Sequence, residues 1–215
     1  MRWVRLAVVV GGVLVAAILL APLALYLHFV RLADTAIVPG APDAFPPDAL
    51  ELMARSLGCD ERPVFEAMNV YSVWFHQGDC ELTIANQVAR QMLYREGPPR
   101  PQREHLPASV ATAIWVTRHW GADQALATTL EQSYFGRDAV GLDAAAQKYF
   151  ARASSELTRE ELAQLIAAAQ APSHLDPWCG SAQNQERANR LLKRDPATPI
   201  SSRIIKQPPG ACTKP

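Results

Sequence analysis

The hydrophobic pattern of the chain changes sharply near residue 31. Residues 6–30 contain no Asp, Glu, Lys or Arg, and arginines flank the run on both sides. A helix of about 20 apolar residues crosses a bilayer, so this run is long enough to span one with some tilt. The sequence therefore predicts a transmembrane helix over 6–30, preceded by a short segment, 1–5.

A cleavable signal peptide is the alternative for this run. The apolar core of a signal peptide is about 7–15 residues long and ends in small residues. The best candidate cleavage site, 21–24, is weak and more apolar chain follows it, so an uncleaved anchor is favoured. Because Arg2 and Arg5 precede the run and only Arg31 closely follows it, the positive-inside rule places the N-terminus in the cytoplasm and the remainder outside.

Beyond residue 31 the pattern is helical. A linker over 31–46 is punctuated by prolines, and apolar residues then recur with a period near 3.6, whereas no strand alternation of any length occurs. Thr158 and Glu161 have the spacing of a capping box, which predicts a helix start. The fold class is all-α. We expect helices at 48–57, 63–75, 82–93, 107–121, 122–134, 139–150, 158–170 and 183–193.

The charge balance and the cysteine spacing argue against two kinds of function, nucleic-acid binding and zinc binding. The 21 basic and 21 acidic residues cancel, and three of the basic ones lie within residues 1–31, so the remainder is mildly acidic. This balance argues against a nucleic-acid-binding protein. Four cysteines on the outer side allow two disulfides in three pairings, and their spacings do not resemble a zinc site. Their grouping favours Cys59–Cys80 and Cys179–Cys212.

Two stretches carry a resemblance to a known family. Residues 130–177 resemble the peptidoglycan glycosyltransferase domain, glycosyltransferase family 51, in an ordered set of positions. Upstream, residues 80–87 (CELTIANQ) and Arg90 are similar to the family's GGSTITQQ…K motif. The matching positions of the first stretch are Tyr134, Phe135, Gly136, Arg137, Gly141, Ala145, Ala146, Tyr149, Phe150, Leu157, Thr158, Glu161 and Pro172.

The resemblance implies a fold and a location. It implies a lysozyme-like, all-α glycosyltransferase domain over 47–194, followed by a Pro-rich tail at 195–215. This domain would be periplasmic, held by the anchor on the inner membrane of a bacterium. The partners implied are membrane lipid, lipid II or a glycan strand, and a cell-wall synthase, with no nucleic acid. No cofactor is expected, except a divalent metal such as magnesium if the domain is active.

The family's chemistry depends on two glutamates. One deprotonates a sugar hydroxyl of lipid II, and the second, with nearby cations, assists the departing pyrophosphate. The family's first Glu-Asp pair aligns here with Gly58, Cys59 and Asp60. Glu61 aligns with the first glutamate only if the alignment is shifted by a few residues. Ser109 stands at the position of the second glutamate.

The candidate site residues follow from this comparison. Glu61 and Glu104 are the candidate catalytic carboxylates, although a five-residue shift is needed for Glu104, and each is otherwise a solvated charge. Thr83, Gln87, Arg90 and Arg137 are the candidate substrate-binding residues, which otherwise cap, pack or lie on exposed faces.

Three hypotheses about function remain. The leading one is a catalytically impaired relative that binds lipid-linked precursor, a glycan strand or a synthase. The rivals are an active enzyme that uses Glu61 and Glu104, and a purely structural membrane-anchored partner.

Overall fold

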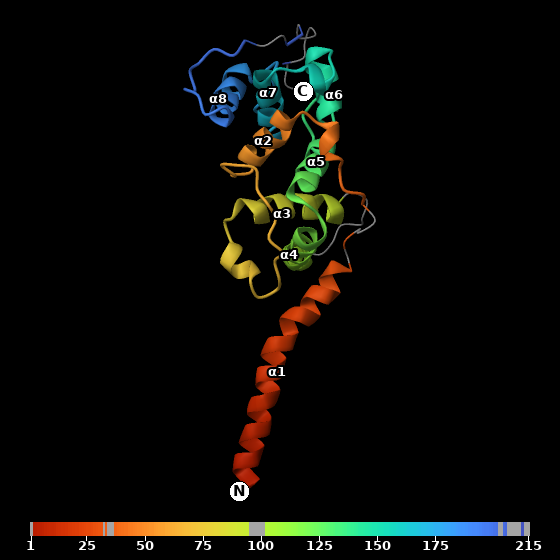
Figure 1. Cartoon of the computed structure of the whole chain (residues 1–215), viewed down its shortest axis with the longest axis vertical. Coiled ribbons are helices and arrows are strands. Elements are labelled where there is room, and N and C mark those ends of the chain that lie inside the picture. The colour runs from red at the N-terminus through yellow and green to blue at the C-terminus, as the bar shows by residue number, and fades with distance from the viewer. Residues whose placement is uncertain are drawn as a thin grey trace. The chain divides into compact units, whose positions relative to one another are not determined.

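The computed structural model describes residues 2–31, 33, 37–94, 102–201, 204–205 and 212. These residues fall into two compact units. The first unit combines the described parts of 1–37 with 65–119, and the second combines 38–64 with 120–215. Every regular element in the described residues is a helix, which confirms the all-α prediction (Figure 1). Parts of the predicted linker and tail lie outside these residues.

The first unit is built on two packed helices. α3 buries an apolar face, including Ile84, Val88 and Met92, against α4. α4 also packs against α1, which comes from the start of the chain. The elements of this unit are α1 (Arg2–Val30), the 3₁₀ turn η2 (Val73–His76), α3 (Cys80–Tyr94) and α4 (Gln102–His119).

α1 is apolar and exposed over most of its length. The stretch Val8–Val30 contains 23 residues with a mean hydropathy of 2.7, and is long and apolar enough to cross a membrane. Side chains 8–20 are all exposed. Among the side chains of α1 whose burial is described, half-buried positions occur only near its end, at Pro22, Tyr26, Phe29 and Val30. These positions share one helix face, so the last two turns are the part of α1 that packs into the unit.

The second unit surrounds one buried helix. α7 lies between α2, α6 and α8 and buries Leu162, Leu165 and Ile166 completely or nearly so. The elements of this unit are η1 (Pro42–Ala44), α2 (Pro47–Ser56), α5 (Ala122–Gln132), α6 (Leu142–Phe150), η3 (Ser154–Glu156), α7 (Arg159–Gln170) and α8 (Ser181–Leu191).

The predicted capping box is present at the start of α7. The Glu161 amide donates to the Thr158 hydroxyl at 3.3 Å, and the Thr158 amide donates to the Glu161 carboxylate at 2.9 Å. Glu161 is only 1% exposed. Arg152 pairs with its carboxylate at 2.6 Å, which supplies the partner that a buried charge needs.

Two glycines shape the turn between α5 and α6. Gly136 has φ +91° and Gly141 has φ +89°, a region that L side chains rarely adopt. A Cβ on Gly141 would lie 2.9 Å from the Glu131 carbonyl oxygen. Both glycines belong to the matching positions of the family motif, and their conformation gives the physical reason for that match.

The predicted helix over 63–75 is wrong. The chain has no regular helix between Ser56 and Val73, because its polar groups bond elsewhere. The Asn69 carboxamide accepts from the amides of Tyr71 and Ser72 at 2.9 and 3.0 Å, which makes a local turn. The Met68 amide donates to the Thr117 hydroxyl on α4 at 3.3 Å, a long-range bond that replaces a helical one.

Two predicted helix starts are also wrong. α4 begins at Gln102, so Pro107 lies inside the helix rather than in its first turn. α6 begins at Leu142 rather than 139, because Gly141 before it is not helical. The other expected helices agree with the structure to within about two residues at each end, the usual uncertainty of helix boundaries.

The described part of the tail is held against the second unit. The Asn189 amide nitrogen donates to the carbonyls of Pro196 and Thr198 at 3.0 and 2.7 Å. Further along, the Ile205 amide donates to the Tyr149 carbonyl at 2.9 Å. Cys212 forms a disulfide with Cys179, the pairing that the cysteine grouping favoured. Contacts with α6 and α8 and the disulfide to Cys179 therefore hold the described residues of the tail.

Candidate functional site

A pocket in the first unit carries part of the family motif. It has a volume of about 350 Å³ and lies between α3, the first turns of α4, and the segment that leads into α3. We call it the α3–α4 pocket. Its lining residues are Val73, Gln77, Gly78, Asp79, Leu82, Thr83, Asn86, Leu106 and Val110.

Local bonds fix the polar residues of the α3–α4 pocket. Thr83 lies in the first turn of α3, where its amide and hydroxyl both donate to the Asp79 carbonyl at 3.2 Å. The Asp79 carboxylate pairs with His76 Nδ1 at 2.9 Å. Asn86 accepts a 3.2 Å hydrogen bond from the hydroxyl of Ser109 on α4. The pocket thus presents neutral and acidic polar groups beside exposed apolar side chains such as Leu106.

The other candidates on α3 continue the same helix face. Gln87 follows Thr83 by four residues and Arg90 by seven, so the three share one side of the helix. Gln87 is half-buried and Arg90 is exposed. Neither residue lines the α3–α4 pocket itself. Arg90 is therefore an exposed cation on the same face of α3 as Thr83, which lines the pocket.

The two candidate carboxylates lie outside the described pockets. Glu61 is exposed in the loop after α2, in the second unit, and not in a helix. Glu104 is half-buried in the first turn of α4, in the first unit. The adjacent Asp60 pairs with Lys193 at 3.3 Å. Neither Glu61 nor Glu104 thus lines the α3–α4 pocket or the pocket at the end of α2, although Asp60 does line the latter.

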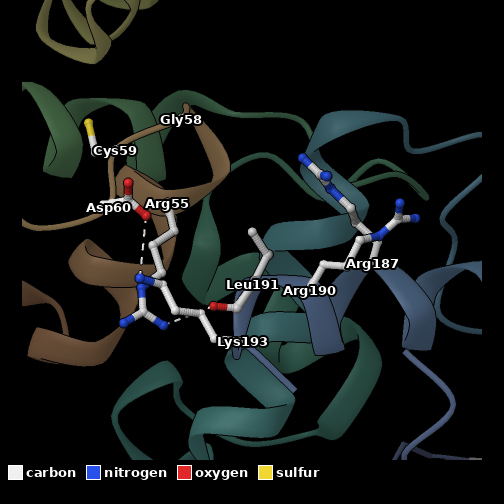
Figure 2. Close-up of a pocket in the computed structure, with 8 residues that line it drawn as sticks. All are labelled: Arg55, Gly58, Cys59, Asp60, Arg187, Arg190, Leu191 and Lys193. Carbon is white, nitrogen blue, oxygen red and sulfur yellow. Dashed lines mark hydrogen bonds and ion pairs between the residues drawn. The ribbon is translucent and has the colours of Figure 1, made fainter. Parts of the chain in front are cut away.

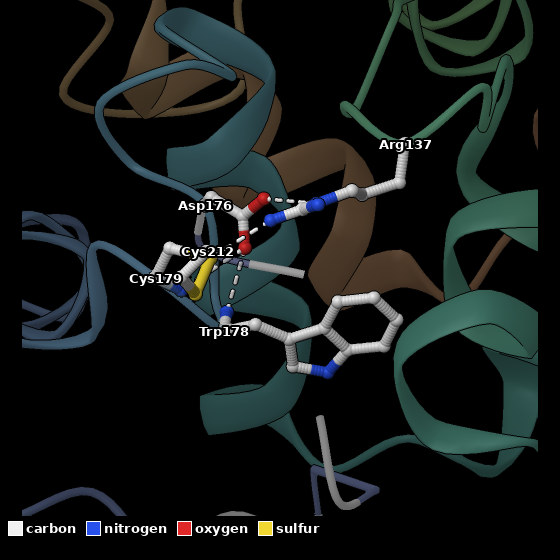
Figure 3. The surroundings of a disulfide bond; sticks show 5 residues. All are labelled: Arg137, Asp176, Trp178, Cys179 and Cys212. Carbon is white, nitrogen blue, oxygen red and sulfur yellow. Dashed lines mark hydrogen bonds and ion pairs between the residues drawn. A yellow bond between two sulfur atoms is a disulfide. The ribbon is translucent and has the colours of Figure 1, made fainter. Parts of the chain in front are cut away.

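Arg137 is held by a network within the second unit (Figure 3). Its Nε donates to the Asp176 carboxylate at 2.7 Å, and its guanidinium lies 5.5 Å from the centre of the Trp178 ring. Asp176 is buried, and its other oxygen accepts the Trp178 amide at 2.7 Å. This arrangement gives Arg137 a structural role in joining the α5–α6 turn to the segment before α8.

Asp176 and Trp178 are neighbours of Arg137 that the sequence analysis did not single out. They lie in a proline-containing stretch without periodicity. Asp176 falls within the stretch that resembles the family, but neither residue is one of its matching positions. Tyr149, one of the family positions, stacks edge-on against Trp178 with ring centres 5.0 Å apart. Burial, with a further contribution from the negative charge of Asp176, raises the pKa of Tyr149, and its hydroxyl donates to the Phe135 carbonyl at 3.2 Å.

Cysteines and possible metal ligands complete the inventory of reactive groups. In the described chain none of the four cysteines is a free thiol. The partner expected for Cys59, namely Cys80, stays a prediction. Across the residues with described positions, no three His, Cys, Asp or Glu side chains gather as metal ligands would. Magnesium therefore stays an expectation tied to catalytic activity.

Comparison with known proteins identifies the family. The model of the transglycosylase family matches residues 64–195, which is more than half of the chain. The chain belongs to the transglycosylase family. The match includes α3 and the glycine-containing turn between α5 and α6, and it begins after Glu61. This transglycosylase-family chain therefore carries a glycosyltransferase-like domain, as its motifs implied.

Relatives of this transglycosylase-family chain are much longer proteins. Penicillin-binding protein 1A of Rickettsia felis is 38% identical over 112 residues, which cover 52% of this chain and 14% of the relative. Penicillin-binding protein 1A of Escherichia coli strain K12 is 30% identical over 137 residues, covering 64% and 16%. Penicillin-binding protein 1F of Bacillus subtilis is 36% identical over 83 residues, covering 39% and 12%. The similarity to this chain thus spans only a small part of each relative.

Proposed function

We propose that this chain is a membrane-anchored, periplasmic transglycosylase relative that binds lipid-linked cell-wall precursor or glycan without polymerising it. Its family membership and its similarity to penicillin-binding proteins support a link to cell-wall synthesis. The apolar stretch of α1 supports the anchor. The disulfide between Cys179 and Cys212 supports an oxidising compartment on the outer side of the inner membrane.

The observation that carries the proposal is the position of the carboxylates. A sugar hydroxyl is a weak nucleophile and needs a general base within hydrogen-bond reach. The family match begins at residue 64, beyond Asp60 and Glu61, and neither lies in the α3–α4 pocket. Asp60 is already paired with Lys193. The residues at the first glutamate's place therefore belong to a different unit from this pocket and are not among its lining residues.

The second glutamate's place has a neutral group. Ser109 stands at that position, and its hydroxyl donates to Asn86, a residue of the α3–α4 pocket. A hydroxyl cannot take the role of a carboxylate beside a pyrophosphate. Glu104 lies more than a helical turn earlier on α4. Neither candidate glutamate lines this pocket, and its lining carboxylate, Asp79, is paired with His76. This arrangement supports binding over turnover.

Lipid II and glycan strands are the ligands that fit this surface best. The α3–α4 pocket combines hydrogen-bonding side chains for sugar hydroxyls with exposed apolar ones, and Arg90 is a cation that a phosphate would approach. A cell-wall synthase is the alternative partner, in which case the surface would contact protein instead. Membrane lipid surrounds α1 in either case.

Binding of lipid II to the full-length protein in detergent micelles tests this function. We expect a lipid II analogue to bind without being consumed, and Arg90→Ala to weaken the binding. The matched control is Lys148→Ala, which removes an exposed cation on α6 of the second unit. If wild-type protein does not bind lipid II or glycan, and a synthase co-purifies with it, the structural-partner hypothesis replaces this one.

A further inference from the structure

A second pocket lies in the second unit, between the end of α2 and the end of α8 (Figure 2). It has a volume of about 220 Å³, and we call it the α2–α8 pocket. Four basic side chains and one carboxylate line it, so its charge differs from that of the α3–α4 pocket. The lining residues are Arg55, Gly58, Cys59, Asp60, Arg187, Arg190, Leu191 and Lys193.

Three of these cations have an ordinary structural role. Arg55 pairs with Glu51 at 2.5 Å, Arg190 with Glu186 at 3.2 Å, and Lys193 with Asp60 at 3.3 Å. All three cations lie at or just beyond the last turn of a helix, where positive charge complements the helix dipole. These residues alone would not indicate a ligand.

Arg187 has no such role. It lies in the middle of α8, away from the C-terminal turn, and extends beside Arg190 in Figure 2. Its Nε donates to the neutral side-chain oxygen of Gln170 at 2.5 Å. No carboxylate pairs with it among the residues that the structure describes. Burial, and then the positive charge of Arg190, lower the pKa of Arg187. An anion in the pocket would relieve both effects.

A buried donor on the opposite wall also lacks a partner. Arg55 Nε is buried and makes no hydrogen bond within the described structure, although its two terminal nitrogens bond to Glu51 and to the Leu191 carbonyl. A buried N–H without an acceptor is destabilising, because it has lost its hydrogen bonds to water. The pocket therefore has an uncompensated cation on one wall and an unsatisfied donor of a second guanidinium on the other.

We propose that the α2–α8 pocket binds a phosphate group, with Arg187 as its main ligand and Arg55 and Arg190 as supporting donors. The donors come from two helices on different sides of the pocket. A planar carboxylate is satisfied by one guanidinium fork, whereas a tetrahedral phosphate accepts bonds from several directions. The site does not depend on the α3–α4 pocket, which belongs to the first unit.

Titration of the full-length protein in detergent micelles with inorganic phosphate tests this site. Calorimetry gives the affinity, and the Nε–H resonance of Arg187, assigned through Arg187→Gln, reports which residue is contacted. We expect phosphate to shift this resonance and Arg187→Gln to weaken binding about tenfold or more, since it removes charge-assisted hydrogen bonds. Acetate at equal ionic strength should compete poorly.

Control variants test whether phosphate binds in the α2–α8 pocket rather than at a cation elsewhere on the chain. Lys148→Gln removes an exposed cation of the same unit and should leave phosphate binding unchanged. Arg90→Ala removes the cation proposed to meet lipid-linked precursor in the first unit and should also leave it unchanged. Arg187→Lys keeps the charge without the guanidinium fork and should bind with intermediate affinity, provided that its circular dichroism and thermal unfolding match the wild type.

Reconstitution of the protein into vesicles distinguishes a lipid headgroup from a soluble phosphate as the ligand of this pocket. In vesicles containing phosphatidylglycerol, a headgroup in the pocket would reduce the affinity for added phosphate relative to vesicles of phosphatidylcholine alone. Equal affinity in both would assign the site to a soluble phosphate group. The proposal is overturned if Arg187→Gln binds phosphate as tightly as the wild type, or if acetate displaces phosphate at equal concentration.

Discussion

This chain keeps some residues of the family motif and replaces others. Gly136 and Gly141 keep a backbone conformation that side chains resist, and Thr158 and Glu161 keep a reciprocal cap. By contrast, Ser109 at the second glutamate position forms a neutral hydrogen bond. The retained residues serve turns and packing and so preserve the scaffold, and we propose that the carboxylates required by the family's chemistry are lost.

Gly141 provides the first test at this scale. We expect Gly141→Ala to lower the free energy of unfolding by about 2 kcal/mol, because φ +89° and the 2.9 Å approach to the Glu131 carbonyl both oppose a Cβ. Urea denaturation of the full chain in detergent measures the change. Gly121→Ala is the matched control, since its φ is −78° and the nearest atom lies 3.6 Å from the added Cβ. Equal losses in both variants would contradict this role for the Gly141 backbone.

Arg137 provides a second residue-scale prediction. Arg137→Ala leaves the buried Asp176 carboxylate without its cation and should cost about 3 kcal/mol of unfolding free energy. Arg62→Ala breaks an exposed pair with Asp123 and should cost less than about 1 kcal/mol. Thermal and urea unfolding of both variants measure these changes in the free energy of unfolding. An Arg137→Ala protein as stable as the wild type would contradict this structural role of Arg137.

Individual elements show why sequence patterns succeeded in one region and failed in another. The start of α7 was predictable because Thr158 and Glu161 form a local cap that requires no distant partner. The loop before η2 was not, because the Met68 amide and carbonyl bond to Thr117 and Arg118 on α4, about 50 residues away in the chain. Asp176 was missed for the same reason, since its partner Arg137 lies 39 residues earlier.

The cap of α7 is testable on its own. Thr158→Ala removes the hydroxyl that accepts the Glu161 amide and should lower the free energy of unfolding by about 1 kcal/mol. Thr158→Ser retains the hydroxyl and should lose less than half of that. Urea unfolding with a common slope for all three proteins gives the comparison. A Ser variant as unstable as the Ala variant would show that the lost methyl group, rather than the cap, sets the cost.

At the scale of the whole molecule, the proposed membrane anchor, α1, would determine which compartment the transglycosylase domain occupies. We expect the N-terminus to be cytoplasmic, because Arg2 and Arg5 precede the apolar stretch and only Arg31 closely follows it. A C-terminal fusion to alkaline phosphatase, which is active only outside the cytoplasm, should therefore be active. The same fusion to green fluorescent protein should be dark when exported by the general secretory route. The opposite pattern would place the domain in the cytoplasm and remove lipid II on the outer face as a ligand.

The central claim is that this transglycosylase-family chain binds cell-wall precursor without polymerising it. Incubation of the full-length protein with lipid II, beside an active transglycosylase as a positive control, tests that claim most directly. We expect the wild type and Glu61→Gln both to leave lipid II unpolymerised. Glycan polymer formed by the wild type and abolished in Glu61→Gln would contradict it and establish an active enzyme with Glu61 as its base.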